Sequence, residues 1–407
     1  MLNIQYAFFL IGALVCLSLL LFLKRKFDFL TIYILILFLY TLPLFFGKVI
    51  NVYVGDFINA NPSTFVVMGI VYFITSFFLL KDNNYIYRRY EFTSTEEKLA
   101  LKVILIFSAI GMFLYIPNLL SSGSKVELLE NTNLLSAVIY QNMPVFGFLL
   151  ALKIKNRKYL IIFAFMLLFL LVFGARRSIA IAFMGSIIIL AQPYSFRLIE
   201  KYKLILISFI FLIIVVLSKT LYGYILSLGV VQGFFSWMSG FEVKYLLTGS
   251  EFLGTSTILN SVIEYDFKTD RILYFYSFLS LQPIPLNYFG YSSSYFNEMF
   301  QSVLFPGINY GMAYNPWAEV YSAFGYLGVI ILALFVPSLL NFFWYSYCHS
   351  KALFSIVVLF MGLILSFWIE RNSLATIFAY MRNVFYPLIL VYFFILIINN
   401  ILRGVSK

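Results

Sequence analysis

Apolar residues occur along the chain in long runs, and short polar or charged segments separate these runs. Most runs have roughly 15 to 25 residues, about the length that a helix needs to cross a bilayer. Backbone groups inside a bilayer find no water to bond, and a helix satisfies them internally. The pattern predicts an all-α polytopic membrane protein with about eleven transmembrane helices, in the ranges 4–23, 29–46, 62–80, 99–120, 134–152, 159–173, 178–191, 204–222, 317–342, 352–369 and 383–401.

Basic residues assign the connections between these runs to the two sides of the membrane. Basic clusters follow the first, third, fifth and seventh runs, and the first cluster is Lys24, Arg25 and Lys26. Short loops rich in lysine and arginine stay in the cytoplasm. We therefore expect an outer N-terminus, a cytoplasmic C-terminus and an odd number of spans.

One connection on the outer side, 223–316, is far longer than the others. Loops of this length without a role are uncommon, and this one is rich in Phe, Tyr, Leu and Ile. Apolar residues recur at helical spacing from Thr255 to Tyr265, as in an amphipathic helix. We expect a single integral membrane domain over 1–407, with this large helical loop inserted between spans 8 and 9.

Composition excludes a soluble protein. The chain is 62% hydrophobic and 11% charged, whereas soluble domains are about 45–50% apolar and about 25% charged. The net charge of +11 would suggest a nucleic-acid partner in a soluble protein, but the topology explains it here. Glycine-rich phosphate loops and DxD-type carboxylate pairs are both absent from the sequence. We therefore expect no nucleotide, no metal site and no cofactor.

Two pairs of arginines stand where lipid is expected. Arg176 and Arg177 separate two runs that each rise only ~22 Å, against a hydrocarbon core of about 30 Å. Arg371 and Arg382 lie just before or inside the last span, about three helical turns apart, so they share a face if one continuous helix carries both. Each arginine facing lipid would cost about 2.5–3.5 kcal/mol. The side chains must therefore face an aqueous cavity or a partner.

Carboxylates near these spans are few. Glu319 and Glu370 are the two that the sequence places there, which predicts a cationic pocket that opens outward. Guanidinium groups suit phosphate oxygens because they donate two parallel hydrogen bonds. In the alternative interpretation, Arg371 pairs locally with Glu370, and Arg176 or Arg177 extends to the membrane interface.

The ninth span begins with a recognisable helix start. Asn315 is the predicted N-cap and Pro316 the first helical residue. Glu319 then falls in the first turn, where the helix dipole favours an anion. In a second interpretation, Glu319 is a carboxylate at the cavity rim that binds a sugar hydroxyl or accepts its proton. Gly325 and Gly328 are predicted to allow close approach of another helix.

These features together resemble a known family. They are the Gly174-Ala175-Arg176-Arg177 start of a short span, the outer loop with Leu281-Gln282-Pro283-Ile284-Pro285, the Gly307-Ile308-Asn309-Tyr310-Gly311 segment, the Glu-x-Tyr-x-x-x-Gly-x-x-Gly pattern from Glu319, and the late arginines. The whole chain is similar in architecture to the Wzy-type oligosaccharide repeat-unit polymerases, the O-antigen and capsule polymerases of bacteria.

The resemblance implies a GT-C-like glycosyltransferase in the bacterial inner membrane. Its substrates would be undecaprenyl-pyrophosphate-linked oligosaccharides, joined at the periplasmic face, which makes the 223–316 loop periplasmic. Its partners would include membrane lipid, a chain-length regulator and a flippase, and no nucleic acid. By position, the family's essential arginines correspond to Arg176, Arg177, Arg371 and Arg382. Related O-antigen ligases carry a histidine where this chain has Tyr314, which favours a polymerase.

The chemistry expected of such an enzyme assigns the remaining residues. The four arginines would bind pyrophosphates without a metal ion, because cations aimed at a leaving group stabilise the transition state. Glu319, Tyr314, Asn315 and Tyr321 would orient the acceptor hydroxyl, and whether any residue is a true general base stays open. Tyr288 and Tyr291 would stack on sugars or pack the loop. The alternatives are an O-antigen ligase or other lipid-linked-sugar glycosyltransferase, and a lipid-linked oligosaccharide flippase or transporter.

Overall fold

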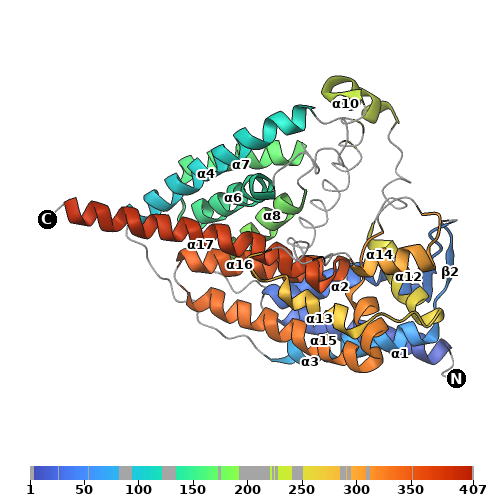
Figure 1. Cartoon of the computed structure of the whole chain (residues 1–407). Helices are drawn as coiled ribbons and strands as arrows, with labels where there is room; N and C mark the ends of the chain where they lie inside the picture. Colours follow the sequence, from blue (N-terminus) through green and yellow to red (C-terminus); the bar gives the residue numbers. More distant parts are fainter. Residues whose placement is uncertain are drawn as a thin grey trace. The chain divides into compact units, whose positions relative to one another are not determined.

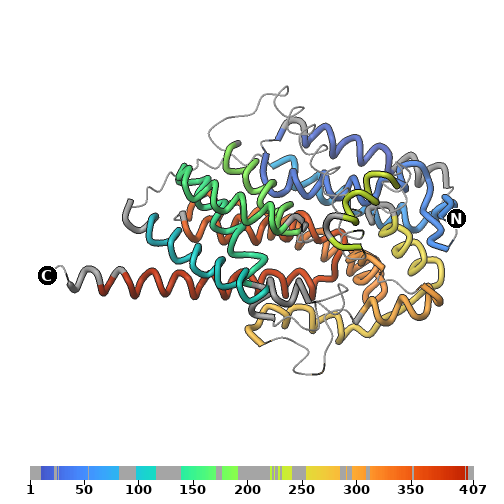
Figure 2. Tube along the Cα trace, turned by 90° about the horizontal axis from the view of Figure 1, so that it is seen from above, coloured from blue at the N-terminus to red at the C-terminus, as the bar shows by residue number. Residues whose placement is uncertain are grey.

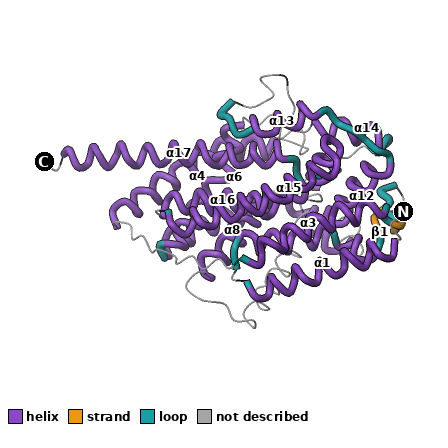
Figure 3. The backbone as a smooth tube through the Cα atoms, turned by 90° about the horizontal axis from the view of Figure 1, so that it is seen from below, coloured by secondary structure: helices purple, strands orange, loops and turns teal. Residues whose placement is uncertain are grey.

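A computed structural model of the chain shows that it is built from helices (Figures 1 and 3). The structure describes residues 4–25, 27–53, 55–81, 94–121, 134–172, 176–191, 228–240, 251–284, 295–308, 312–350 and 352–405, together with positions 221, 224 and 290.

Long helices occupy nearly all of the predicted spans. They are α1 (Ile4–Lys24), α2 (Phe29–Tyr40), α3 (Pro62–Leu80), α4 (Ser94–Ser121), α6 (Leu134–Lys153), α7 (Arg157–Val172), α8 (Arg176–Ala191), α15 (Pro316–His349), α16 (Ala352–Trp368) and α17 (Leu374–Val405). The predicted span 204–222 lies outside the described residues, apart from position 221.

Five stretches of the described helices are long and apolar enough to cross a membrane. They are Pro62–Leu80, Lys98–Tyr115, Pro316–His349, Leu353–Arg371 and Leu374–Ile398. Shorter apolar helices accompany them in α1, α2 and α8. The chain is thus a helical, membrane-embedded protein, which confirms the coarse form of the fold prediction.

The second predicted run does not form one helix over 29–46. Helix α2 ends at Tyr40, and a short 3₁₀ turn, η1 (Leu42–Phe46), follows with a proline in its first turn. Proline has no backbone N–H and disrupts a helix interior, so the long helix is wrong. Strands β1 (Lys48–Ile50) and β2 (Phe57–Asn59) then form an antiparallel pair with Val49 opposite Ile58. The apolar pattern gave no signal for this hairpin.

Short helices occupy the described parts of the long connection 223–316. They are α10 (Val230–Gly240), α12 (Glu251–Glu264), α13 (Arg271–Leu279) and α14 (Tyr295–Leu304). The predicted amphipathic helix falls on α12, whose Ile258, Leu259 and Val262 are fully buried. Helix α12 packs on β1, and Thr257 fixes the contact. Its hydroxyl donates to the carbonyl of Ile50 at 2.8 Å and accepts from the N–H of the same residue at 3.2 Å.

The chain divides into two compact units. Unit 1 contains Met1–Ile86, Thr248–Tyr345 and Met361–Arg382, and unit 2 contains Tyr87–Leu247, Ser346–Phe360 and Asn383–Lys407. Within unit 2, α6 packs against α4, α7 and α8, and Figure 2 shows α4 and α6 side by side. The rings of Tyr115 and Tyr140 stack there at 3.8 Å. Gly147 packs so close to Phe163 that an added methyl group would lie 2.3 Å from that ring.

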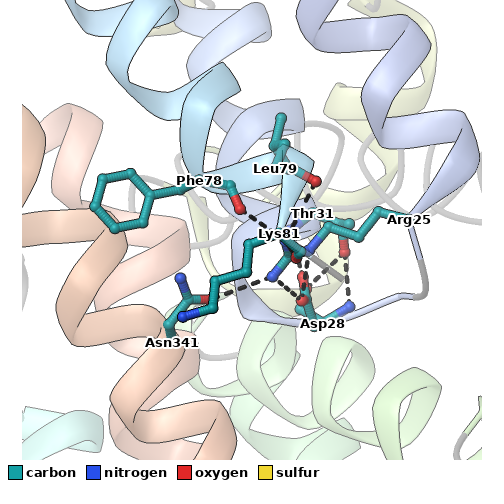
Figure 4. Close-up of polar contacts among 7 residues, drawn as sticks. All are labelled: Arg25, Asp28, Thr31, Phe78, Leu79, Lys81 and Asn341. Carbon is teal, nitrogen blue, oxygen red and sulfur yellow. Dashed lines mark hydrogen bonds and ion pairs between the residues drawn. The ribbon is translucent and has the colours of Figure 1, made fainter. Parts of the chain in front are cut away.

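Arg25 is a structural residue of unit 1, although its place in a basic cluster marked it only as a sign of the cytoplasmic side. It is 2% exposed, and its Nη2 lies 2.7 Å from Oδ2 of Asp28 (Figure 4). Asp28 also caps α2 through Thr31. The other acceptors of the guanidinium are three carbonyls at the end of α3 and one amide on α15, namely Phe78 O at 2.9 Å, Leu79 O at 3.4 Å, Lys81 O at 2.7 Å and Asn341 Oδ1 at 3.1 Å. We call this set the Arg25 cluster.

Candidate functional site

The start of α15 is fixed by a side-chain cap, as the sequence predicts. Oδ1 of Asn315 accepts a hydrogen bond of 3.0 Å from the backbone N–H of Ala318, and α15 begins at Pro316. Nδ2 of Asn315 donates to the carbonyl of Thr255 on α12 at 2.9 Å. The predicted helix start is confirmed. Both ends of the Asn315 amide bond the protein, so this residue anchors the long connection to the span.

Arg371 and Arg382 do not lie on one continuous helix, so the condition for a shared helical face is not met. After α16 comes a 3₁₀ turn, η3 (Ile369–Arg371), and Asn372 is extended. Helix α17 starts afresh at Leu374. Its cap is Ser373, whose Oγ accepts a hydrogen bond of 3.1 Å from the N–H of Thr376. Serine caps a new helix readily, which explains why the chain breaks here.

Two hydrogen bonds join the start of α15 to η3. The backbone N–H of Tyr314 donates to the carbonyl of Arg371 at 2.9 Å. The indole N–H of Trp317 donates to Oε2 of Glu370 at 2.8 Å, and both side chains are buried. The predicted residues Tyr314, Asn315 and Arg371 thus gather at one place in unit 1, which we call the α15–η3 junction.

Neutral groups lie next to the carboxyl of Glu370. Its Oε2 accepts the indole N–H of Trp317, and the phenol of Tyr33 on α2 lies near it. Its Oε1 and the hydroxyl of Tyr33 are buried without a hydrogen-bond partner among the described residues. The hydrogen bond that the structure shows for this carboxyl is therefore with an indole rather than with Arg371.

Glu319 lies in the interior of unit 1, with 0% exposure. Two buried tyrosines, Tyr314 and Tyr274 on α13, lie close enough to interact electrostatically with the Glu319 carboxylate. Burial raises the pKa of both phenols well above the usual value, and the Glu319 carboxylate raises each pKa further. Both phenols therefore stay protonated at neutral pH and can donate hydrogen bonds.

Arg382 is the most deeply buried of the three predicted arginines whose side chains the structure describes, Arg177, Arg371 and Arg382. It lies inside α17, within the apolar stretch Leu374–Ile398, and is only 8% exposed. Arg371 is half-buried at the end of η3. Both belong to unit 1.

The other two arginines belong to unit 2. Arg176 and Arg177 form the first turn of α8, and the side chain of Arg176 lies outside the described residues. Nη2 of Arg177 donates to Oε1 of Gln141 on α6 at 3.0 Å. Gly174 and Ala175 of the same motif also lie outside the described part of the chain.

Helix α15 is broken at Gly325. Its φ of 63° and ψ of −148° are not helical, and this region of backbone conformation is essentially restricted to glycine. An added Cβ at Gly325 would meet nothing within 4 Å, so its predicted role in helix approach is wrong. Gly328 does allow a close approach, but of the first half of the same helix, where Val320 and Phe324 would contact its Cβ at 2.7–2.8 Å.

The segment before α13 bonds the backbone next to the break. The carbonyl of Ser322 accepts from the N–H of Thr269 at 3.3 Å, and that of Ala323 accepts from Nε of Arg271 at 3.3 Å. The hydroxyls of Thr269 and Ser322 share a hydrogen bond of 2.7 Å. The long connection therefore supports the half-helix that carries Glu319.

Of three further tyrosines predicted to bind the substrate, the structure describes one. Tyr321 is half-buried and packs edge-to-face on Tyr326 across the break, with ring centroids 5.3 Å apart. Tyr288 and Tyr291 lie outside the described residues.

The described residues contain no cluster of side chains that could bind a metal ion. No group of three or more His, Cys, Asp or Glu side chains in that part of the chain is arranged to hold a metal ion. Asp266 pairs instead with Lys268 at 2.6 Å on the surface.

Sequence reasoning missed several residues of the α15–η3 junction. The aromatic residues Trp317, Tyr33 and Tyr274 blend into the apolar sequence pattern, and only the tertiary contacts give them a role. Ser373 alone had a local signal, because serine is a preferred N-cap residue.

No protein-family model matches this chain, and no curated protein and no solved structure matches it either.

Proposed function

We propose that this protein is a membrane glycosyltransferase that polymerises lipid-linked oligosaccharide repeat units. It transfers a growing glycan from undecaprenyl pyrophosphate to the next lipid-linked repeat unit, at the periplasmic face of the bacterial inner membrane. The eleven spans, the GT-C-like architecture and the periplasmic side of the 223–316 connection belong to this proposal.

The burial of Arg382 carries the proposal. An arginine inside an apolar helix would cost about 2.5–3.5 kcal/mol if it faced lipid, yet this side chain is only 8% exposed within the stretch Leu374–Ile398. Ionisable residues held inside a membrane protein mark substrate or ion pathways. A guanidinium there suits a substrate that brings phosphate groups to membrane depth, as a lipid-linked sugar does.

The reaction needs no nucleotide. The bond between the sugar C1 and the pyrophosphate oxygen of the donor breaks, and a bond forms between C1 and the acceptor hydroxyl oxygen. The pyrophosphate leaves with the bonding electron pair, and the proton of the acceptor hydroxyl passes to a carboxylate such as Glu319 or to the departing pyrophosphate. Negative charge grows on the leaving pyrophosphate, so arginines aimed at it lower the barrier.

Residues at the start of α15 fit the acceptor side of this chemistry. Glu319 is held on the half-helix before Gly325 and is flanked by protonated phenols. A carboxylate with such donors can orient a sugar hydroxyl or take its proton. In unit 2, Arg176 and Arg177 are proposed to bind a second lipid-linked pyrophosphate.

One observation favours a second candidate, a lipid-linked oligosaccharide flippase. Transporters use discontinuous membrane helices at their substrate sites, and α15 is discontinuous at Gly325. An O-antigen ligase is the enzymatic alternative, and Tyr314 in place of the ligase histidine weighs against it.

Gene deletion separates these functions. A strain without the polymerase should still attach single repeat units to its surface, so that gels show one step in place of a ladder. A strain without the ligase or the flippase should attach none. Ladders restored by a variant with all four arginines changed to alanine would overturn the proposal.

A further inference from the structure

Arg371 lies at the end of a short 3₁₀ turn, which its own hydrogen bonds hold less firmly than those of an α-helix would. The turn η3 has three residues and ends at the extended Asn372, and 3₁₀ hydrogen bonds have poorer geometry than those of an α-helix. Two bonds stiffen the end of the turn, because the N–H and the side-chain amide of Asn372 both donate to the carbonyl of Trp368, at 3.1 Å and 3.0 Å. The direction of the Arg371 guanidinium therefore depends on what else holds η3.

Glu370 supplies the side-chain anchor. Its Oε2 accepts the indole N–H of Trp317 at 2.8 Å. The backbone carbonyl of its neighbour Arg371 accepts the N–H of Tyr314 at 2.9 Å. Both bonds lead to the first residues of α15, which Asn315 caps.

Stability alone does not account for a glutamate at this position. Glu370 is 2% exposed and Trp317 is fully buried. A buried carboxyl is costly to desolvate, and an apolar residue of similar volume is often as stable or more stable at such a place. What the carboxyl adds is a directed bond that fixes the turn relative to α15.

We propose that Glu370 is a positioning residue that acts through Trp317 to hold Arg371 toward the pyrophosphate of the lipid-linked substrate. This inference rests on the proposed function. Glu370 itself does not touch the substrate, and its carboxyl is engaged by the indole.

Binding of undecaprenyl pyrophosphate to the full-length protein in detergent tests this role. Glu370→Leu removes the acceptor and keeps the volume, and Trp317→Phe removes the donor and keeps an aromatic ring. Each should weaken binding about tenfold, because a misdirected guanidinium keeps its charge and loses its paired hydrogen bonds. The double variant should bind no more weakly than either single one, since both remove the same bond. Glu370→Gln keeps a carbonyl acceptor and should bind within about twofold of the wild type.

The background variant Arg371→Ala shows whether the effect passes through Arg371. In that background, Glu370→Leu should cause no further loss of affinity, whereas general damage would lower affinity again. Trp344→Phe is the matched control, because Trp344 is another buried indole of unit 1, packed edge-to-face on Phe29 at 5.4 Å.

Two results would overturn the inference alone. They are wild-type affinity in both Glu370→Leu and Trp317→Phe, or an equal loss from Glu370→Leu with and without Arg371. A wild-type protein that does not bind undecaprenyl pyrophosphate, or an Arg371→Ala variant that binds as the wild type does, would instead remove the proposed function, and the positioning role with it.

Discussion

Unit 1 contains two buried sites where arginine and carboxylate lie close in sequence, and the two are built differently. In the Arg25 cluster, the guanidinium meets Asp28 at 2.7 Å and several carbonyls. In the α15–η3 junction, Glu370 accepts a hydrogen bond from the indole of Trp317, although Arg371 is its neighbour in the chain. The same pair of residue types forms an ion pair in one place and is divided in the other.

The difference separates a structural role from the functional role that we propose for the junction. The bonds of Arg25 reach the end of α3, the start of α2 and the side of α15, so the charge serves to join helices. At the junction, the carboxyl fixes a turn, and the guanidinium beside it is proposed to act on a substrate. We therefore expect changes in the Arg25 cluster to reduce stability, and changes at the junction to reduce activity more than stability.

The largest loss of stability should come from Arg25→Ala. Removing one partner of a buried ion pair leaves the other uncompensated and costs about 3–5 kcal/mol. Thermal unfolding of the protein in detergent measures the effect. The double variant Arg25→Ala/Asp28→Ala should lose less than the two single losses combined. Additive losses would show that the two residues do not act as a pair.

Gly325→Ala should cause the second largest loss of stability, because the break in α15 needs a backbone conformation that alanine avoids. The cost is expected to be about 1–3 kcal/mol. Chain extension should fall as well, since the half-helix with Glu319 would shift. Gly12→Ala is the control, because a methyl group at Gly12 of α1 would meet nothing within 4 Å, and it should leave stability nearly unchanged. Equal effects of the two changes would mean that the break is not required.

Ser373→Ala should lower stability by about 1 kcal/mol, the usual value of an N-cap. The bond from Thr376 to Ser373 is 3.1 Å, and its loss frays the start of α17, close to Arg371. Undecaprenyl pyrophosphate binding should weaken more than this loss of stability suggests. Ser338→Ala, at an exposed serine that bonds its own helix at Leu334, is the control. Unchanged binding in Ser373→Ala would contradict the expectation that changes at the junction reduce activity more than stability.

Lys268→Ala should have the smallest effect. Lys268 and Asp266 pair at 2.6 Å, but their side chains are 57% and 78% exposed. Such surface pairs contribute less than about 1 kcal/mol, and salt screens them. Unfolding curves at low and high salt should nearly coincide with those of the wild type. A loss comparable to that of Arg25→Ala would show that exposure is a poor guide to which ion pairs matter here.

Most of the described long helices could be located from the sequence, because long apolar runs indicate them, although their ends and breaks could not. Local signals also sufficed at the start of α15, where Asn315 and Pro316 specify a cap within three residues. The Thr255 to Tyr265 pattern likewise located α12, since a buried helical face repeats along the chain.

Features that depend on distant partners could not be predicted. The basic cluster with Arg25 has the same composition whether the side chain faces water or joins three helices. Trp317 and Glu370 lie far apart in sequence, so neither predicts the bond between them. The polar segment from Glu370 to Ser373 marks the end of the tenth run, but no local signal shows that α17 begins as early as Leu374. The break at Gly325 was not predicted, because glycine fits both a close packing position and a non-helical backbone conformation.

The proposal that an inward-held guanidinium acts on a lipid-linked pyrophosphate is tested most directly by chain extension with purified Arg382 variants. The protein would be placed in liposomes with lipid-linked repeat units extracted from the deletion strain, and product length would be followed on gels. We expect Arg382→Ala to extend chains about 10²–10³-fold more slowly than the wild type, as when one preorganised transition-state donor is removed. Arg382→Lys, which keeps the charge without the paired donors, should fall between them. Chain extension by Arg382→Ala at the wild-type rate would contradict the account.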